Sequence, residues 1–170
     1  MKKFFIALVA LVGIGIAANA QKAEFQFGYG GYTAMDACDY HDDIAPVKTA
    51  WGSLTAGVNF KVAPSFWLGP SYTFSSSSFK HSDVNLYYHV IMLNGRYEYY
   101  RTRNVTLYGH LGLGVDITHM AFDDPVNKTY FAYQISPLGA NVPLSSSFSL
   151  FGELGFGAQG LLQVGGRVKF

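Results

Sequence analysis

The side chains best suited to catalysis in this sequence are a histidine, a serine and an aspartate that follow one another. Hydrolysis through a serine needs its hydroxyl beside a histidine base that an acid orients. Neighbouring side chains on a strand point to opposite faces, however, and His81, Ser82 and Asp83 fall in a polar stretch that predicts a loop. His41 and Asp42 are residue types that occur in acyl-transfer sites, but no acyl-transfer motif surrounds them. We therefore predict no catalytic residue and no enzymatic activity.

A second group of reactive side chains is a run of acids that could supply oxygen ligands to a hard cation. It has neither the spacing nor the glycine turn of a calcium-binding loop, and no phosphate loop, zinc pattern or haem motif occurs elsewhere. Cys38, the one cysteine of the chain, has no internal disulfide partner. We predict no metal site and no cofactor. The acidic run consists of Asp36, Asp39, Asp42 and Asp43, with His41 among them.

A third group of charged residues falls in one phase of the alternating segments described below. Charges taken out of water must pair or reach solvent. Glu153 and Arg167 lie on neighbouring predicted strands, which predicts a direct ion pair, with Arg96 and Glu98 joining it across the interior. We predict an interior polar network made of Arg96, Glu98, His110, Asp116, Glu153 and Arg167. Glu24 and Lys169 belong to the same phase.

Eight segments in which apolar and polar side chains alternate, as they do on strands, must position these residues. The clearest alternation, with Leu111 and Leu113 on either side of Gly112, lies in the fifth segment. Two segments contain a proline, which donates no ladder hydrogen bond: Pro70 predicts a bulge or locally broken pairing, and Pro137 predicts a bulge or an early end of its segment. The segments span 23–32, 51–62, 66–75, 84–99, 104–118, 129–140, 148–158 and 161–170.

The composition and the connections indicate how these strands assemble. Only 14% of the residues are charged, against about 25% in an average soluble domain, which is too few to cover a soluble β-domain. Segments of roughly ten residues can cross a bilayer when tilted, and backbone groups in lipid must all be paired, so the sheet must close. Long and short connections alternate along the chain. The predicted fold is all-β: an eight-stranded antiparallel up-and-down transmembrane β-barrel.

Alternation alone leaves open which face lies outside. A soluble, lipocalin-like barrel would bury the apolar phase around a ligand. The polar phase here is rich in Gly, Ser and Thr, which are small enough for a narrow interior, and aromatic residues gather near both ends of the apolar phase. These features favour the apolar phase outside. The even number of strands puts both termini on one side, and the alternation of long and short connections indicates that this is the periplasmic side.

The first residues predict export. Residues 1–20 combine Lys2 and Lys3, an apolar run and Ala18-Asn19-Ala20, which is the pattern of a cleaved secretory signal peptide. We predict that residues 21–170 form the barrel domain. Without Lys2 and Lys3, 10 of the 12 basic residues remain against 11 acidic ones, so no nucleic-acid partner is predicted.

The last segment alternates Leu162, Val164, Gly166, Val168 and Phe170 against polar residues. It resembles the C-terminal signal of bacterial outer-membrane barrels, which the barrel-assembly machinery reads. The positions that fill this signal are Gln163, Gly165, Val168 and Phe170.

Residues 132–170 carry a wider resemblance through Phe151, Glu153, Leu154 and the Gly155-Phe156-Gly157 run. The chain resembles the small outer-membrane β-barrel family of OmpA- and OmpX-like barrels, and more closely the porin-family outer-membrane proteins of Gram-negative Bacteroidetes. The resemblance implies an outer-membrane location, with outer-membrane lipid, lipopolysaccharide and the barrel-assembly machinery as partners. We expect a structural, surface-interaction or adhesion role with a largely plugged polar lumen. The alternatives are a narrow passive pore, a lipid A-modifying enzyme and a soluble ligand-binding barrel.

Overall fold

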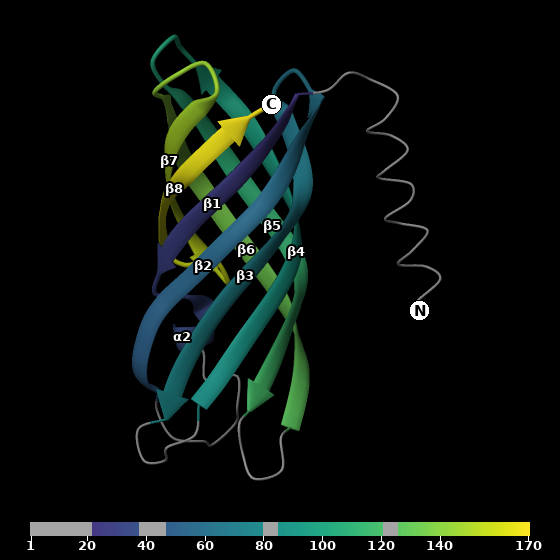
Figure 1. Ribbon diagram of the computed structural model, residues 1–170, viewed down its shortest axis with the longest axis vertical. Coiled ribbons are helices and arrows are strands. Elements are labelled where there is room, and N and C mark those ends of the chain that lie inside the picture. The colour runs from purple at the N-terminus through teal and green to yellow at the C-terminus, as the bar shows by residue number, and fades with distance from the viewer. Residues whose placement is uncertain (1–21, 38–46, 80–84, 121–125) are drawn as a thin grey trace, which may run out of the picture.

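The structure is a closed barrel of eight strands, given by a computed structural model that describes residues 22–37, 47–79, 85–120 and 126–170. Each strand pairs antiparallel with its neighbours in the chain, and β1 pairs with β8 to close the sheet (Figure 1). The predicted fold is confirmed. The strands are β1 (Ala23–Gly31), β2 (Val47–Ala63), β3 (Phe66–Phe79), β4 (Asn85–Arg101), β5 (Thr106–Met120), β6 (Val126–Pro143), β7 (Phe148–Gly157) and β8 (Leu162–Lys169).

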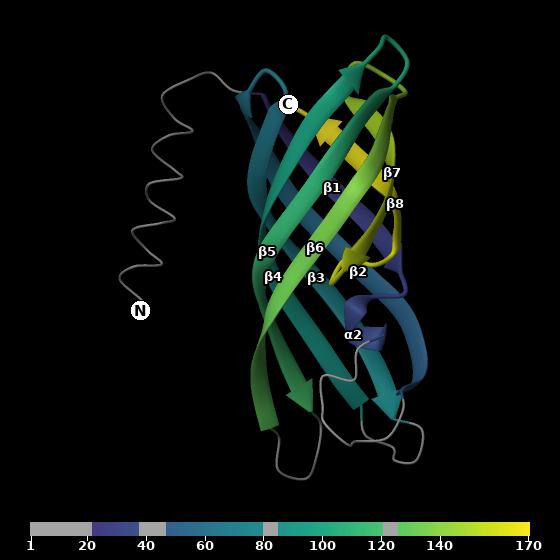
Figure 2. The same cartoon turned by 180° about the vertical axis from the view of Figure 1, so that it is seen from behind.

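The wall of the barrel is uneven in height. Strands β7 and β8 have 10 and 8 residues, whereas β2 and β6 have 17 and 18. The strands from β2 to β6 are therefore longer than the predicted ten residues, and they extend past the turn that joins β7 to β8 (Figure 2). The predicted loop 76–83 begins too early, since Ser76 pairs with Tyr87 in the β3–β4 ladder. Outside the membrane a strand needs paired backbone groups but no apolar outward face. The alternation of apolar and polar residues can therefore end before the strand does.

A short helix, α2 (Ala34–Ala37), lies within the predicted first loop. Thr33, Ala34 and Met35 are buried, and α2 contacts β2 and β7 on the low side of the wall. No helix among the described residues is long and apolar enough to cross a membrane. The predicted signal peptide, Cys38 and most of the acidic run, together with His81, Ser82 and Asp83, lie outside the described residues.

The two prolines behave differently. The ladder between β2 and β3 has no partners at Gly69 and Pro70, but the register is the same on both sides, so the pairing is broken without a bulge. At Pro137 the register of β6 shifts by one residue against both β5 and β7, which is a bulge. The strand then continues to Pro143.

The apolar phase of the strands faces outward. On β4, Ile91 is 45% exposed while its neighbour Val90 is fully buried inside the barrel. Leu111, Leu113 and Val115 on β5 are exposed in the same way. An outward apolar surface around a polar interior is typical of membrane barrels. The alternative of a soluble barrel with an apolar cavity is therefore wrong.

The interior is filled by side chains in two layers. The half nearest the termini contains charged and amide side chains, including Arg96, Glu153 and Arg167. The other half contains an apolar cluster beside α2, formed by Met35, Leu86, Tyr88, Val90, Met92, Ala132 and Ala158.

Candidate functional site: the polar interior of the barrel

The centre of the polar layer is the carboxylate of Glu153, which β7 places inside the barrel. Arg167 on the adjacent β8 reaches Glu153 Oε1 with Nη2 at 3.0 Å, as a direct ion pair. Tyr108 on β5, from another part of the wall, donates its hydroxyl to the same oxygen at 2.8 Å and accepts Arg167 Nη2 at 2.9 Å. These three residues are buried, so the pair is closed off from solvent.

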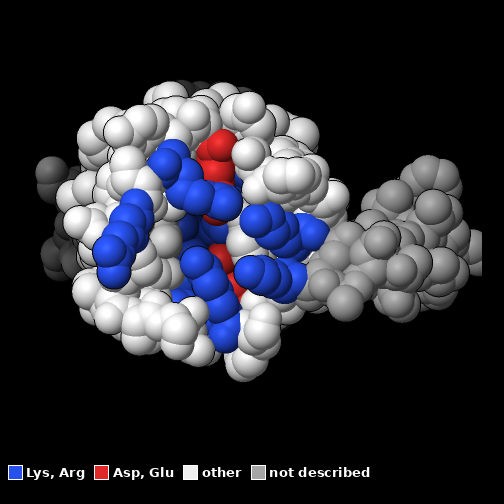
Figure 3. Space-filling model, turned by 90° about the horizontal axis from the view of Figure 1, so that it is seen from above, with Lys and Arg blue, Asp and Glu red and all other residues white. Residues whose placement is uncertain are grey.

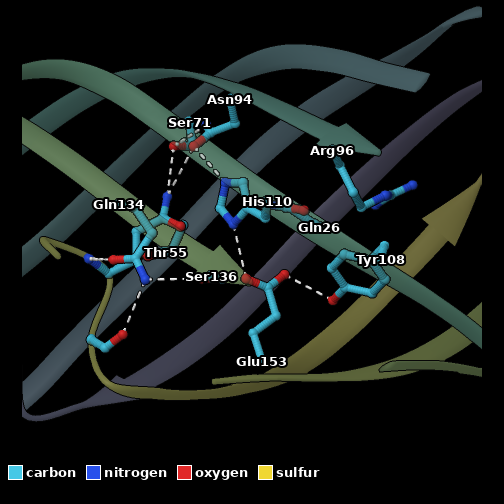
Figure 4. Close-up of polar contacts among 12 residues, drawn as sticks. Gln26, Thr55, Ser71, Asn94, Arg96, Tyr108, His110, Gln134, Ser136 and Glu153 are labelled. Carbon is cyan, nitrogen blue, oxygen red and sulfur yellow. Dashed lines mark hydrogen bonds and ion pairs between the residues drawn. The ribbon is translucent and has the colours of Figure 1, made fainter. Parts of the chain in front are cut away.

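The second oxygen of this carboxylate is bound by a histidine. His110 Nδ1 lies 2.8 Å from Glu153 Oε2, and His110 Nε2 lies 3.0 Å from Asn94 Oδ1 (Figure 4). Both ring nitrogens thus lie within hydrogen-bond distance of side-chain oxygens, and His110 joins Glu153 of β7 to Asn94 of β4.

A second carboxylate, Glu24 on β1, joins the two buried arginines. Its Oε1 forms an ion pair with Arg96 Nη1 and lies 3.6 Å from Arg167 Nε. Asn59 Nδ2 donates to the same oxygen at 3.3 Å and to Gln26 Oε1 at 2.9 Å. Glu24 therefore links the cations of β4 and β8 across the lumen.

The network ends near the barrel mouth at Glu98, which is partly buried. Glu98 Oε1 lies 3.5 Å from Arg96 Nη2 and accepts a hydrogen bond from Trp67 Nε1 at 2.8 Å. Its other oxygen pairs with Arg101. The guanidinium of Arg96 lies over the Trp67 ring, 4.8 Å from its centroid, so its faces are covered by aromatic carbon.

Toward the apolar layer, uncharged groups continue the network. Asn94 Nδ2 donates to Ser71 Oγ at 2.7 Å, and Gln159 Nε2 donates to the same hydroxyl at 3.0 Å. Gln159 belongs to the connection between β7 and β8, which folds into the lumen: its backbone N donates to Gln134 Oε1 at 2.9 Å, and its carbonyl accepts Ser53 Oγ at 3.1 Å. The connection is thus held inside the barrel by hydrogen bonds to β2, β3 and β6.

Little space is left between these groups. The cavity that they enclose has a volume of about 10 Å³, which is roughly the least that holds one water molecule. Some buried polar atoms, among them Glu24 Oε2 and Arg96 Nε, have no hydrogen-bond partner among the described residues. The cavity is lined by Gln26, Asn59, Asn94, Arg96, His110, Glu153 and Arg167.

The structure brings together five of the six predicted network residues and leaves one apart. Arg96, Glu98, His110, Glu153 and Arg167 form the chain of contacts described above. Asp116 is buried on the same face of β5, but its carboxylate accepts a long hydrogen bond from Thr118 Oγ1, at 3.4 Å, and its Oδ1 has no hydrogen-bond partner within the described ranges. Alternation sets the face of a residue and not its height along the barrel, which explains the difference.

The residues of the predicted assembly signal lie along β8 and just beyond it. Gln163 is buried in the interior, and Gly165 pairs with Gly28 of β1. Val168 is partly buried on the outer face, and the Phe170 ring is 80% exposed.

Several members of the network were not predicted. Tyr108, Asn94 and Gln134 have the inward phase of their strands, which was the available signal, but only charged residues were selected from that phase. Gln159 lies in a turn and had no periodic signal at all. Glu24 was assigned to the inward phase without a partner.

The arrangement offers no obvious nucleophile and base. Ser136 pairs with His110 in the β5–β6 ladder, yet both nitrogens of His110 are engaged by Glu153 and Asn94. A serine needs a free base within hydrogen-bond reach. No group of three or more His, Cys, Asp or Glu side chains that could hold a metal occurs in the part of the chain described.

Basic side chains surround the mouth of the barrel at the end where β8 finishes. Figure 3 shows them around the opening, with the acidic groups deeper inside. Arg101 and Lys22 act electrostatically on Lys61, as does Lys169, so these cations lie within Coulombic reach of one another. Arg101 pairs with Glu98, whereas the others have no carboxylate within ion-pair distance among the described residues. We call Lys22, Lys61, Arg101, Arg103 and Lys169 the basic rim.

Comparison with known proteins agrees with this architecture. The N-terminal β-barrel domain of OprF from Pseudomonas aeruginosa superimposes with a TM-score of 0.51 at 14% identity, over 88% of this chain and 97% of that chain. Ail, the attachment invasion locus protein of Yersinia pestis, gives 0.48 at 13% identity, over 88% and 93%. At 14% identity the likeness to the OprF domain concerns the fold alone.

The sequence itself identifies the family. No curated protein is significantly similar to the chain. The family described as outer membrane protein beta-barrel domain matches residues 6–156, which is most of the sequence. The chain therefore belongs to the outer membrane protein β-barrel domain family and is an outer-membrane protein.

Proposed function

We propose that the protein is a structural component of the outer membrane whose lumen is closed and whose outer end serves surface interaction or adhesion. The observation that carries the proposal is the packing of the lumen. The guanidinium groups of Arg96 and Arg167 are matched by carboxylates, and the cavity beside them has a volume of about 10 Å³. A path for solutes needs a continuous polar channel, which an eight-stranded barrel filled by side chains lacks.

Two layers would have to open before a solute could pass. The first is the polar network around Glu153, and the second is the apolar cluster that includes Met35 and Met92. Opening the first costs buried ion pairs, and opening the second exposes apolar side chains to water. The described interior therefore favours a closed barrel over the alternative of a narrow pore.

The experiment that tests this proposal is conductance in planar lipid bilayers. The wild-type protein, shown to be folded by its heat-modifiable migration in SDS-PAGE, should give no steady conductance above that of empty bilayers. The matched positive control is a triple variant, Arg96→Ala and Arg167→Ala with Met35→Ala, which opens both layers. Steady wild-type channels, changed in size by Arg167→Ala, would contradict the closed lumen and establish the pore.

The interaction role rests on the uneven wall. Strands β2 to β6 extend beyond the turn between β7 and β8, and this extension lies at the end opposite the described termini (Figure 1). Short turns at the termini end are typical of the periplasmic side of such barrels. We therefore assign the extended wall to the outside of the cell, where it can contact other surfaces.

Adhesion can be tested separately from conductance. Cells that display the wild-type protein should bind to abiotic or cell surfaces more strongly than cells that lack it. Shortening the β5–β6 extension by removing 118–128 should abolish the difference while the heat-modifiable band persists. Cells that lack the protein could bind as strongly as wild-type cells and keep an intact outer-membrane permeability barrier. That result would overturn both the interaction role and the structural role.

A further inference from the structure

The outer wall of the barrel is not covered evenly by side chains. Between β3 and β6, in the half nearest the termini, it contains a groove of about 630 Å³ with an almost entirely apolar lining. This volume lies within the range of about 300–1,000 Å³ that is usual for small-molecule sites. Phe66, Leu93, Leu111, Ile135 and Pro137 form its sides.

Two glycines on the outward phase create the groove. Gly95 pairs with Leu111, and Gly109 pairs with Tyr97, so the two glycines lie diagonally across the β4–β5 ladder, two residues apart. A Cβ at Gly95 would meet the Phe66 ring at 3.1 Å, whereas a Cβ at Gly109 would meet nothing closer than 3.8 Å. Gly109 is thus the open floor of the groove.

The bulge of β6 keeps that floor bare. The β5–β6 register shifts between Tyr108 and His110, so Gly109 has no ladder partner on β6. Pro137, which lies in the bulge, forms one edge of the groove. A bulge bends its strand and increases the local twist, which holds the side chains of β6 away from Gly109.

The surroundings of the protein indicate what fills this space. The groove lies on the outward apolar face, which in an outer-membrane protein is bathed by lipid. Association within a membrane depends on close van der Waals packing, because water does not drive apolar surfaces together there. A narrow hydrocarbon chain can enter a groove whose floor is backbone. Tyr97 and Tyr99, which are 57% and 49% exposed, lie at one end of the groove and keep the wall of a second barrel at a distance.

The charge beyond that end complements a lipid headgroup. After Tyr99, β4 continues to Arg101 and then to the turn that contains Arg103. Both belong to the basic rim, whose cations outnumber the carboxylates near them. Arg101 already pairs with Glu98, while Arg103 has no ion pair among the described residues. Tyrosine at the membrane interface with a cation beyond it is the arrangement that favours an anionic phosphate.

We propose that the groove over Gly109 binds one acyl chain of an anionic phospholipid, with the lipid phosphate at the basic rim beside Arg103. The site is independent of the lumen, so its failure would leave the proposed closed barrel untouched. A lipid bound in this groove would be held in a fixed position against this face of the barrel.

The acyl-chain part is tested by filling the groove. The folded full chain in detergent is mixed with phosphatidylglycerol, and the bound lipid is measured by native mass spectrometry. Wild-type protein should retain one lipid, and Gly109→Leu should bind it at least tenfold more weakly. Gly152→Leu is the matched control, because Gly152 is also outward-facing and its added Cβ would meet nothing closer than 3.8 Å. Heat-modifiable migration shows that each variant is folded.

The headgroup part uses a second pair of variants. Arg103→Gln should weaken phosphatidylglycerol binding and remove its preference over phosphatidylcholine, whereas Lys128→Gln at the other end of the barrel should change neither. Equal lipid retention by wild type and Gly109→Leu would overturn the site. Dimers that Gly109→Leu disrupts would assign the groove to a second copy instead. Selective retention of lipid A, lost in the same variant, would overturn the assignment to a phospholipid.

Discussion

Glu153 and Arg167 face each other across the β7–β8 ladder, with Glu153 Oε1 and Arg167 Nη2 separated by 3.0 Å. The pair is completed from the far wall by Tyr108, whose hydroxyl contacts both charged groups. The Arg167 guanidinium is also covered by aromatic rings, lying 4.1 Å from the Phe151 centroid and 4.7 Å from the Tyr108 centroid. A charged pair in a barrel lumen therefore has the packing of a core and holds together strands that are not neighbours.

The first prediction concerns removal of one charge of this pair. Glu153→Gln removes the carboxylate that Arg167 and His110 share and leaves the buried Arg167 with Glu24 alone, 3.6 Å away. Breaking a buried pair by removing one partner typically costs about 3–5 kcal/mol. We expect a loss of that size in the free energy of unfolding, measured by urea denaturation of the barrel in detergent or lipid vesicles.

The control for this experiment removes the whole cluster together. A triple variant, Glu153→Leu with Arg167→Met and His110→Leu, leaves no unpaired charge at this point, and replacing a buried ion pair by apolar groups is often neutral. It should be more stable than Glu153→Gln alone. If Glu153→Gln unfolds at the same urea concentration as wild type, the network does not stabilise the barrel.

The second prediction concerns the buried acid outside the network. Asp116 is 2% exposed, with one weak contact to Thr118 and no cation within ion-pair distance in the described part of the chain. Burying a lone carboxylate is unfavourable. Asp116→Asn should therefore leave stability unchanged or raise it, opposite to Glu153→Gln. A loss of more than about 1 kcal/mol, the usual size of one net hydrogen bond, would show that Asp116 has a partner.

The alternation of apolar and polar residues shows which face of the wall a side chain is on, and this decides which interior contacts could be predicted. The period of two assigned Glu153, Arg167 and Arg96 to the inner face, and strand order made β7 and β8 neighbours. The contact between Glu153 and Arg167 was therefore predictable. The same reasoning placed Asp116 in the network incorrectly, because height along the axis depends on the stagger of tilted strands, which a single strand's pattern does not contain.

Other features needed the closed structure. Tyr108 has the inward phase of its segment, but its role depends on a partner from β7, which the phase of one segment does not identify. Gln159 enters the lumen from a turn, where no periodicity exists. The groove over Gly109 depends on the one-residue shift at Pro137; the bulge was predicted there, but the space it leaves on β5 was not.

A third prediction separates two glycines that face opposite sides of the wall. Gly139 lies against the Tyr108 ring inside the barrel, and a Cβ there would overlap the Tyr108 ring atoms Cε2 and Cζ. Gly139→Ala would push Tyr108 away from Glu153 and Arg167, with an expected cost of about 1–3 kcal/mol for overpacking. Gly152→Ala on the outer face should have no measurable effect in the same urea titration. Equal stability of both variants would mean that Tyr108 does not fill the lumen tightly.

The last prediction fixes the direction of the barrel in the membrane. Cys38 is the only cysteine, so Cys38→Ser provides a background in which single cysteines can be placed. Ser146 lies in the short β6–β7 turn at the termini end, and Lys128 is exposed at the other end of β6. If short turns face the periplasm, a membrane-impermeant maleimide should label Lys128→Cys on intact cells and spare Ser146→Cys, while both react after permeabilisation. Labelling of Ser146→Cys alone on intact cells would reverse the barrel and place the basic rim at the cell surface. The groove would then face the outer leaflet, where lipid A rather than phosphatidylglycerol supplies the phosphate.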